Sequence, residues 1–403
     1  MSATPSHDST MVSTRHAITD SPRLYLAFEL GWTQWKLGFA PGLDARPWRR
    51  TIPARDLTAL QDAIAKACRR FELPDDTAVC SCYEAGRDGF WLHRFLDQAG
   101  VDNCVVDSAS IEVNRRAKRA KTDRMDVNKL LSMLIRHHQG EAKVWSIVRV
   151  PTEADEERRE LHRELVELKH ERTRCTNRIK GLLARCGLAI TVDHHLPDVL
   201  NELTTWDGRR FVEVYPQLHQ RLGREFERMQ LLNDQIRQLE QQRLKQLRHG
   251  QGPQVDMARQ LLSLHGVGLN SAWLAVMECF GWRRFDNRRQ VGALIGMAPT
   301  PYQSGDSHRD QGISKAGNPR MRIMAVELAW CWVRFQPQSE LAQWYERRFA
   351  HGSKRQRKIG IVALGRKLLI QLWRYLQTGQ PPQGAIVVDW QIKVNGKTRP
   401  IAA

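Results

Sequence analysis

Two different patterns of apolar and polar residues divide the chain. The stretch RLYLAFELGWTQWKLGFA, from Arg23 to Ala40, predicts two strands joined by a Gly-Trp-Thr turn. Apolar residues at helical spacing follow over 57–71, and an apolar strand then ends at Glu84. A helix over 91–99 and a strand over 103–108 come next. Strands that alternate with helices predict an α/β domain.

After residue 150 the apolar spacing becomes helical. Over 152–183, and again over 222–239, apolar residues recur every three or four positions among many charges. Two such helices separated by a break predict a helical hairpin or an oligomerising coiled coil. We favour self-association over packing within one chain, because each polar face is wide. A compact helical domain should follow over 255–377, and AIVVDWQIKV in the tail predicts a short strand.

The expected fold class is therefore α/β plus α, in five parts. The leader is rich in Ser, Thr and His, which predicts disorder. No stretch approaches the roughly 20 apolar residues that a membrane-spanning helix needs, so no membrane contact is expected. The parts are a leader over 1–21, an α/β domain over 22–148, a helical region over 149–250, a second helical domain over 255–378 and a tail over 379–403.

The charge balance indicates a polyanionic partner. Lys and Arg number 62 against 44 Asp and Glu, a net charge of +18. The excess is locally clustered, which favours nucleic acid over the alternative of a merely soluble basic protein. The eight cysteines have neither the spacing of a disulfide framework nor that of a zinc site. Reduced cysteines favour a cytoplasmic protein, here one associated with the nucleoid.

Acidic residues stand at the ends of predicted strands and at the start of a helix. Glu29 ends the first strand, Glu84 ends a later one, and Asp123 and Asp126 begin a helix after the last strand. Strand ends of an α/β sheet converge at one edge, where such folds place their sites. Carboxylates gathered there repel one another unless a divalent cation binds them, and Mg²⁺ (or Mn²⁺) prefers oxygen ligands. The alternative is that Glu29 and Glu84 are solvated strand-end residues.

Two basic clusters could hold a phosphate backbone. One immediately precedes Asp123, and the other lies in RRFAHGSKRQRK, from Arg347 to Lys358, where the alternative is a solvated charged segment. The candidate contacts are Arg115, Arg116, Lys118, Arg119 and Lys121 in the first cluster, and Lys354, Arg355, Arg357 and Lys358 in the second.

The helical domain contains two further motifs. LLSLHGVGLNSAWLAVMECF has the form of a helix-hairpin-helix, in which Gly266 and Gly268 would let the backbone approach a phosphate. A Gly- and Pro-rich segment from Pro299 to Pro319 predicts a long functional loop. It contains Ser304 before a glycine, so the serine is either an exposed nucleophile or a turn former. Cationic residues that could stabilise an attacked phosphate are Lys315, Arg320 and Arg322.

Together these motifs resemble a known family. AKTDRMD, with Glu84 in CYEAGRDG, resembles the RuvC-like domain of the DEDD-type insertion-sequence transposases. LHGVGLNSAWLAVME and RRFDNRRQVGALIGMAPTPYQSGDSHRDQGISKAGNPRMR resemble that family's serine-bearing domain. The resemblance extends over 23–376. The family that the chain resembles is that of the bridge-RNA-guided recombinases, and the Piv-type site-specific DNA invertases are related to it.

The resemblance implies an RNase H-like fold whose acids bind Mg²⁺. It also implies a serine that forms a covalent phosphoserine link with double-stranded DNA, and a composite site in a dimer or tetramer. A structured guide RNA would pair with donor and target DNA. Glu84, Asp123 and Asp126 match the family's last three acids, and Ser304 matches its nucleophile. The first acid is normally Asp, and Glu29 stands there with a side chain longer by about 1.5 Å.

Three functions are compatible with these residues. The first is a transposase or recombinase that exchanges DNA strands through Ser304. The second is a metal-dependent nuclease or junction resolvase that uses the acids alone, with Ser304 as a loop residue. The third is a nonenzymatic RNA-binding descendant, to which the Glu29 substitution points. A covalent protein–DNA adduct would distinguish the first from the second, and binding without cleavage would support the third.

Overall fold

The computed structural model of the chain describes residues 22–111, 123–141, 144–304 and 307–395. They fall into two compact units, drawn from Met1–Val150 and Pro151–Ala403. The predicted leader over 1–21, the basic residues over 115–121 and the end of the tail lie outside the described residues. The division into five parts stays a prediction.

The first unit is a mixed α/β structure, as the sequence predicts. Its sheet has five strands in the order β3-β2-β1-β4-β5. The strand β1 is antiparallel to β2 and parallel to β4; β2 and β3 pair antiparallel, and β4 and β5 pair parallel. The elements are β1 (Arg23–Leu30), β2 (Gln34–Ala40), β3 (Trp48–Pro53), α1 (Leu57–Arg70), β4 (Ala78–Glu84), α2 (Trp91–Gln98), β5 (Asp102–Val106) and α3 (Asp123–His138).

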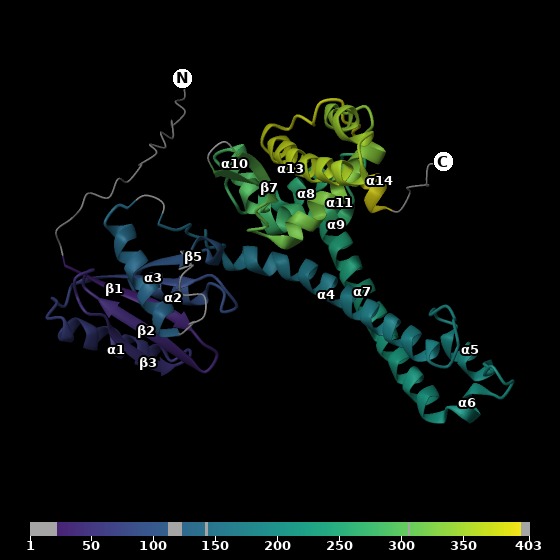
Figure 1. The fold of residues 1–403 in the computed structure, drawn as a ribbon, viewed down its shortest axis with the longest axis horizontal. Helices are drawn as coiled ribbons and strands as arrows, with labels where there is room; N and C mark the ends of the chain where they lie inside the picture. The colour runs from purple at the N-terminus through teal and green to yellow at the C-terminus, as the bar shows by residue number, and fades with distance from the viewer. Residues whose placement is uncertain (1–21, 112–122, 142–143, 305–306, 396–403) are drawn as a thin grey trace, which may run out of the picture. The chain divides into compact units, whose positions relative to one another are not determined.

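Helices cover both faces of this sheet (Figure 1). Leu24, Leu26 and Phe28 of β1 pack with apolar residues of α1 and α2. Tyr25 and Ala27, which alternate with them, pack with α3. The period-2 alternation of β1 therefore buries every second residue against a different helical layer.

The second unit is mainly helical. The long helices α4 and α7 lie side by side as a hairpin, with α5 and α6 at its far end (Figure 1). A separate apolar core joins α8, α9, α11 and α13. The α-helices of the second unit are α4 (Glu153–Ala184), α5 (Leu196–Glu202), α6 (Phe211–Val214), α7 (Pro216–His249), α8 (Pro253–Leu262), α9 (Leu269–Ala275), α10 (Arg288–Leu294), α11 (Pro319–Phe335), α12 (Glu340–Tyr345), α13 (Lys354–Thr378) and α14 (Trp390–Val394).

Two predicted elements of this unit are wrong. The segment expected to be a loop from Pro299 to Pro319 contains a β-hairpin, β6 (Pro299–Ser304) and β7 (Ser307–Ile313). The tail expected to be a strand instead forms the short helix α14. Asp389 begins that helix, because its side chain accepts a hydrogen bond from the Gln391 amide at 2.9 Å. Only Val387 makes a bridge, to Leu264.

The α4–α7 pair confirms the helical hairpin that the sequence offered as one alternative. The packing is within the chain, and self-association through these helices stays a prediction. Thr152 and Asp155 form a capping box at the start of α4. No helix among the described residues is both long enough and apolar enough to cross a membrane.

A buried charged cluster lies where the hairpin meets the helical core. Glu278 is buried and accepts two hydrogen bonds from Arg163, at 2.7 and 3.1 Å. Burial alone would raise the pKa of Glu278, but these bonds and the charges of Arg163, Arg159 and Arg320 lower it. Arg243 is also buried and donates to Asn270 at 2.7 Å.

His162 makes this cluster sensitive to pH. Burial, followed by the charge of Arg243, lowers the pKa of His162 to about 4. The unfolded chain therefore takes up this proton first as the pH falls below about 6.5. Between pH 7 and pH 5 the stability of the second unit should fall by about 2 kcal/mol through this group. Urea unfolding followed by helical circular dichroism at both pH values measures the loss. The variant His162→Gln should lack the part of this stability loss that comes from His162. An equal loss of stability in both proteins would contradict the role of His162.

Candidate functional site

Two of the predicted acids end neighbouring parallel strands. Phe28 of β1 pairs with Tyr83 of β4, and Glu29 and Glu84 are the next residues along each strand. Side chains alternate between faces, so Glu29 follows Tyr25 and Ala27 onto the face that α3 covers. Glu84 follows the buried Cys80 and Cys82 onto the same face. Glu84 is exposed and Glu29 partly exposed.

The direction of α3 brings its first turn to the same edge. At the far end of the helix, His138 lies against Tyr25, with ring centroids 5.6 Å apart, near the start of β1. Closer to its beginning, Val127 lies over Gly38, where a Cβ would come within 2.4 Å of a Val127 methyl. Gly38 pairs with Ala27 in the second half of β1. The helix therefore runs antiparallel to β1.

This direction determines where the remaining acids lie on the backbone. Asp123 and Asp126 occupy the first turn of α3, beyond Val127 and toward the carboxyl end of β1. The backbone thus brings all four predicted acids to one edge of the sheet, from β1, β4 and α3. Lys36 of β2 is the cross-strand partner of Glu29 and adds a cation beside them.

The chemistry of this edge fits a hard divalent cation. The residues predicted to bind it are all Asp or Glu, and carboxylate oxygens are the ligands that Mg²⁺ prefers. A second group, Cys80, Asp102 and His138, places one ligand atom from each residue within 4.8 Å of the others. Burial, with the nearby Asp102 charge, raises the pKa of the Cys80 thiol to about 11, so it stays protonated at neutral pH. Arg23 also lies 3.4 Å from His138, which makes this group a poor cation site.

Ser304 is the last residue of β6 and pairs with Ser307 of β7. A two-residue connection joins the strands, so Ser304 lies at the tip of a hairpin rather than inside a loop. The hairpin base is closed at Ser314, whose amide donates to the Ala298 carbonyl at 3.0 Å. Ser304 therefore lies at the end of the hairpin opposite its base.

The base of the hairpin is closely packed. Gly296 has a φ of 63°, and a Cβ there would lie 2.0 Å from the Ala316 carbonyl oxygen. Gly317 has a φ of 111°, and a Cβ there would lie 2.1 Å from the Leu294 carbonyl oxygen. Asn318 then caps α11 by accepting from the Arg320 and Met321 amides. Glycine is required at both positions, and the packing anchors the hairpin on α10 and α11.

Comparisons with known proteins identify the family to which these units belong. Residues 258–344, which include Ser304, match the model of the transposase IS116/IS110/IS902 family. A Sinorhizobium fredii (strain NBRC 101917 / NGR234) protein named "Putative transposase y4rJ" is 37% identical over 383 residues, covering 91% of this chain and 95% of its own. The chain belongs to the IS116/IS110/IS902 family of transposases. It is therefore an insertion-sequence transposase, an enzyme class that acts on DNA.

Two other relatives agree. A protein of the same strain named "Putative transposase y4qE" is 27% identical over 317 residues, covering 73% of this chain and 67% of its own. The transposase for insertion sequence element IS1328 of Yersinia enterocolitica is 27% identical over 199 residues, covering 46% of this chain and 53% of its own.

The cationic residues beside the transposase hairpin differ in what they contact. Arg322 donates to the carbonyls of Ile295 and Lys315, at 3.1 and 3.0 Å, and so braces the hairpin base. Arg320 and Lys315 are exposed, and Lys315 has a left-handed φ of 57°. These two side chains are the ones available to a ligand, whereas Arg322 has a structural task.

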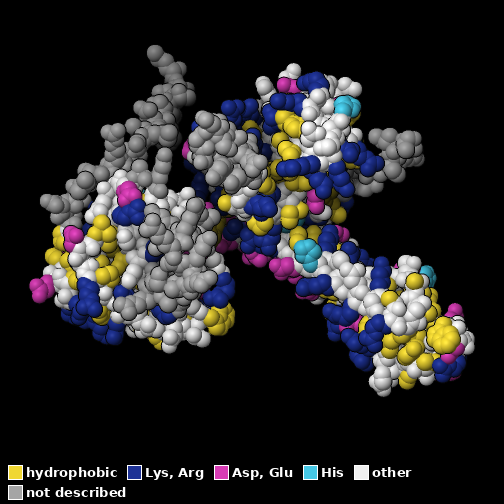
Figure 2. Space-filling model, viewed as in Figure 1, with side chains coloured by type: hydrophobic (Ala, Val, Ile, Leu, Met, Phe, Trp, Pro, Cys, Tyr) yellow, Lys and Arg dark blue, Asp and Glu magenta, His cyan; other side chains and the backbone are white. Residues whose placement is uncertain are grey.

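The second basic cluster forms the start of α13. Ser353 caps the helix and forms a capping box with Gln356. Its four predicted contact residues are all exposed, and Figure 2 shows many Lys and Arg side chains over the helical core. These residues are Lys354, Arg355, Arg357 and Lys358.

The His-Gly-Val-Gly turn connects α8 and α9, as the helix-hairpin-helix pattern predicts. Gly266 has a φ of 82°, and a Cβ there would lie 3.0 Å from the Phe335 side chain. Lys393 donates to the carbonyls of Leu264 and Val267. Gly266 therefore serves the close packing of this turn, and a nucleic-acid contact by Gly266 or Gly268 stays a prediction.

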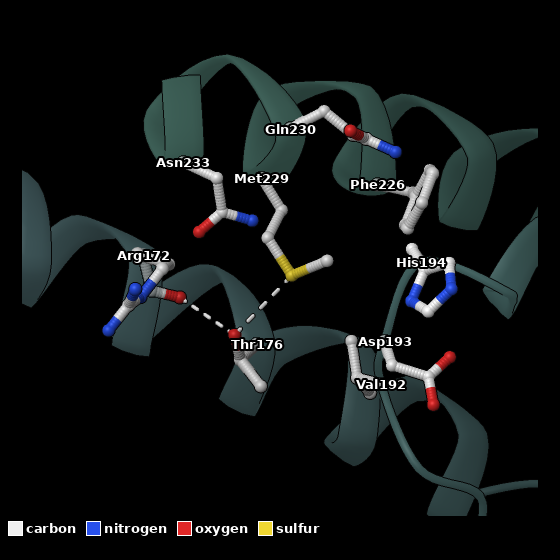
Figure 3. A pocket seen from close by; sticks show the side chains of 9 residues that line it. All are labelled: Arg172, Thr176, Val192, Asp193, His194, Phe226, Met229, Gln230 and Asn233. Carbon is white, nitrogen blue, oxygen red and sulfur yellow. Dashed lines mark hydrogen bonds between the residues drawn. The ribbon is translucent and has the colours of Figure 1, made fainter. Parts of the chain in front are cut away.

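A cavity of about 260 Å³ opens between α4, α7 and the segment that precedes α5 (Figure 3). Phe226 and Met229 line it on α7, and Thr176 donates to the Met229 sulfur at 3.5 Å. Arg172 and His194 provide polar edges. This cavity contains none of the predicted site residues.

One group of side chains after these strand ends was not predicted from the sequence. Trp32 follows β1, Arg55 follows β3 and Arg87 follows β4, and both guanidinium groups lie over the Trp32 ring. The signal was present in the sequence: Gly-Trp in a tight turn exposes a large ring. The two arginines are distant along the chain, so only the sheet topology brings them to it.

Proposed function

We propose that this transposase cuts and exchanges DNA strands with the acidic edge of the first unit and Ser304 of the second. The observation that carries the proposal is the meeting of Glu29, Glu84 and the first turn of α3 at one sheet edge. The strand order, with three antiparallel strands followed by two parallel ones, supports an RNase H-like, RuvC-like assignment for this unit.

The four acids would hold Mg²⁺ or Mn²⁺ in this proposal. Such a cation supplies charge neutralisation at a scissile phosphate and lowers the pKa of an attacking hydroxyl or water. The carboxylates contribute by fixing it at the carboxyl edge of the sheet. Glu29, in the place of the usual Asp, would reach the same edge with a longer side chain.

Ser304 would act as the nucleophile. Its hydroxyl oxygen would bond to phosphorus while one phosphorus–oxygen ester bond of the DNA breaks. The serine loses its proton, and the departing DNA oxygen gains one. The phosphoserine conserves the ester, so a DNA hydroxyl from another strand can reverse the step without an external energy source. Lys315 and Arg320 are exposed cations close in sequence that can offset the developing charge.

The partners in this proposal are double-stranded DNA at the element ends and target, and a structured guide RNA. The net charge of +18 supports polyanionic partners of this kind. A dimer or tetramer joined through α4 and α7 would bring the acidic edges and the serines of several chains together. A Piv-type inversion reaction would need the same assembly. Guide-RNA binding is testable by sequencing RNA that copurifies with the transposase.

The start of α13 should contribute to DNA binding through phosphate contacts. Reversing the charges of Lys354, Arg355, Arg357 and Lys358 should reduce the slope of log affinity against log salt by up to about 3–4. Fluorescence anisotropy with duplex DNA across a salt series measures the slope. The double variant Lys66→Glu/Arg69→Glu on α1 controls for general loss of charge. An unchanged slope in the α13 variant would remove this assignment.

The second candidate is a metal-dependent nuclease or junction resolvase. The acids favour it because they form a complete edge without any residue of the second unit. It predicts free cleaved DNA ends that persist in Ser304→Ala, whereas the transposase mechanism predicts a covalent adduct that disappears. Denaturing gel electrophoresis of labelled junction DNA with Mg²⁺ tells these outcomes apart.

A further inference from the structure

The loops that follow β1, β3 and β4 place an exposed aromatic ring and two arginines at the acidic edge. The chain reads Glu29-Leu-Gly-Trp32 from the end of β1 and Glu84-Ala-Gly-Arg87 from the end of β4, with the same interval in each. Since β3 is antiparallel to β2 and β2 to β1, β3 ends at this edge as well, and Arg55 follows it. All three residues therefore follow strands that end at the edge where Glu29 and Glu84 lie.

The Trp32 ring is held outward by a tight turn. Gly31 donates its amide to the Gln34 carbonyl at 3.1 Å, and a Cβ on Gly31 would lie 2.4 Å from that oxygen. The Trp32 side chain is 65% exposed. Leaving so large an apolar ring in water costs free energy, because its burial would be favourable. A large exposed ring held by a turn that only glycine allows points to a ligand.

Both arginines are fixed over that ring. The guanidinium carbons of Arg55 and Arg87 lie 4.7 and 4.9 Å from the Trp32 centroid. Arg55 also donates to the Trp32 carbonyl at 3.1 Å and to Asp88 at 3.3 Å. Its φ of 67° is a conformation that residues other than glycine rarely take. Asp88, whose side chain is only 9% exposed, lies 3.5 Å from Arg87 as well.

The two arginines divide their tasks. Arg55 uses both terminal nitrogens within the group, so it is a positioning residue. Arg87 makes one long contact to Asp88, and its side chain remains 58% exposed. With one carboxylate between two guanidinium groups, the group keeps a net positive charge that faces solvent. Its chemistry is an aromatic platform next to a guanidinium, the pair that grips single-stranded nucleic acid.

We propose that Trp32 and Arg87 clamp an unpaired nucleotide of the DNA strand at the acidic edge. Trp32 stacks on the base with the part of its ring that the two guanidinium groups leave exposed. The exposed side chain of Arg87 contacts the neighbouring phosphate, and Arg55 with Asp88 holds both residues in place. The clamp rests on the proposed function, because it assigns the strand that the acidic edge would cut. It would keep the strand unstacked while its phosphodiester lies beside the acids.

Binding measured without divalent metal tests the clamp separately from the chemistry. A fluorescein-labelled single-stranded DNA oligonucleotide is titrated with the full chain in EDTA and followed by anisotropy. Trp32→Ala should weaken binding about 5- to 140-fold, and Trp32→Phe should restore most of it, because a ring can still stack. Arg87→Ala should lower the slope of log affinity against log salt by about 0.7.

The control is a second arginine–tryptophan stack near the opposite edge of the same sheet. Arg50 lies 5.6 Å from the Trp48 centroid, and Arg50→Ala should change neither the affinity nor the salt slope as the clamp variants do. Trp32→Ala with wild-type affinity overturns the clamp. So does a loss seen only with RNA of the same sequence, which would assign the platform to RNA. An inactive transposase that still shows the Trp32 and Arg87 effects would sink the proposed chemistry and leave the clamp standing.

Discussion

Ser304→Ala is expected to abolish strand exchange and the covalent protein–DNA adduct together. Loss of a nucleophile can lower a rate by about 10⁶, and alanine offers no oxygen to bond to phosphorus. The hairpin should survive, because its base is anchored by Gly296, Gly317 and the Asn318 cap rather than by the tip. Recombination of a plasmid that contains the element junction measures the loss.

Ser307→Ala is the matched control for that variant. Ser307 is the cross-strand partner of Ser304 and lies on the other side of the same two-residue connection. It should keep adduct formation within a few-fold of the wild type. If Ser307→Ala abolishes the adduct and Ser304→Ala does not, the nucleophile has been assigned to the wrong strand of the hairpin.

Glu84→Gln should remove metal-dependent DNA cleavage. The amide keeps the size of the side chain but not its charge, and loss of a partner that merely orients a metal ligand already costs about 10- to 100-fold. We therefore expect at least a 100-fold loss of cleavage rate with Mg²⁺. The fold should be unaffected, because Glu84 is exposed at a strand end. Cleavage kinetics at increasing Mg²⁺ measure both the rate and the shift in metal requirement.

Asp102→Asn provides the comparison for that loss. Asp102 is an exposed carboxylate at the start of β5, at the opposite edge of the same sheet from Glu84. Its replacement should leave cleavage close to the wild-type rate. Equal losses in the two variants would show that the carboxyl edge has no special role, and equal retention would place the metal elsewhere.

Part of this fold follows directly from the sequence. The strands around Gly31 and the long helix from Glu153 are predictable, because their apolar periods are long and clear. The strand Trp48–Pro53 was missed, because it is a short edge strand in which only Ile52 is buried. Its arginines and proline resemble a loop in composition.

The C-terminal errors have different physical causes. Pro299, Pro301 and Gly305 suggest a loop, but prolines are tolerated in a two-stranded edge hairpin and a bulge between Pro299 and Pro301 accommodates them. The apolar tail AIVVDW suggests a strand by propensity. Asp389 instead caps a helix there, which buries Val394 against the helical core. Tertiary packing overrides a short propensity signal.

The candidate site was predictable only in part. Strand-end acids could be recognised one by one, since Glu29 and Glu84 interrupt apolar runs. Their meeting with the first turn of α3 depends on the antiparallel course of that helix, which the packing of Val127 over Gly38 determines. The group around Trp32 could not be predicted from the sequence, because its two arginines come from two other loops.

The most direct measurement identifies the residue that becomes attached to DNA. The transposase, its copurifying RNA and labelled junction DNA are incubated with Mg²⁺, and the denaturation-resistant adduct is digested with nuclease and protease. Mass spectrometry should then find a nucleotide remnant on the peptide that contains Ser304, absent when Asp123→Ala is used instead. Cleaved ends without any adduct, or a remnant on a different residue, would contradict strand exchange through Ser304.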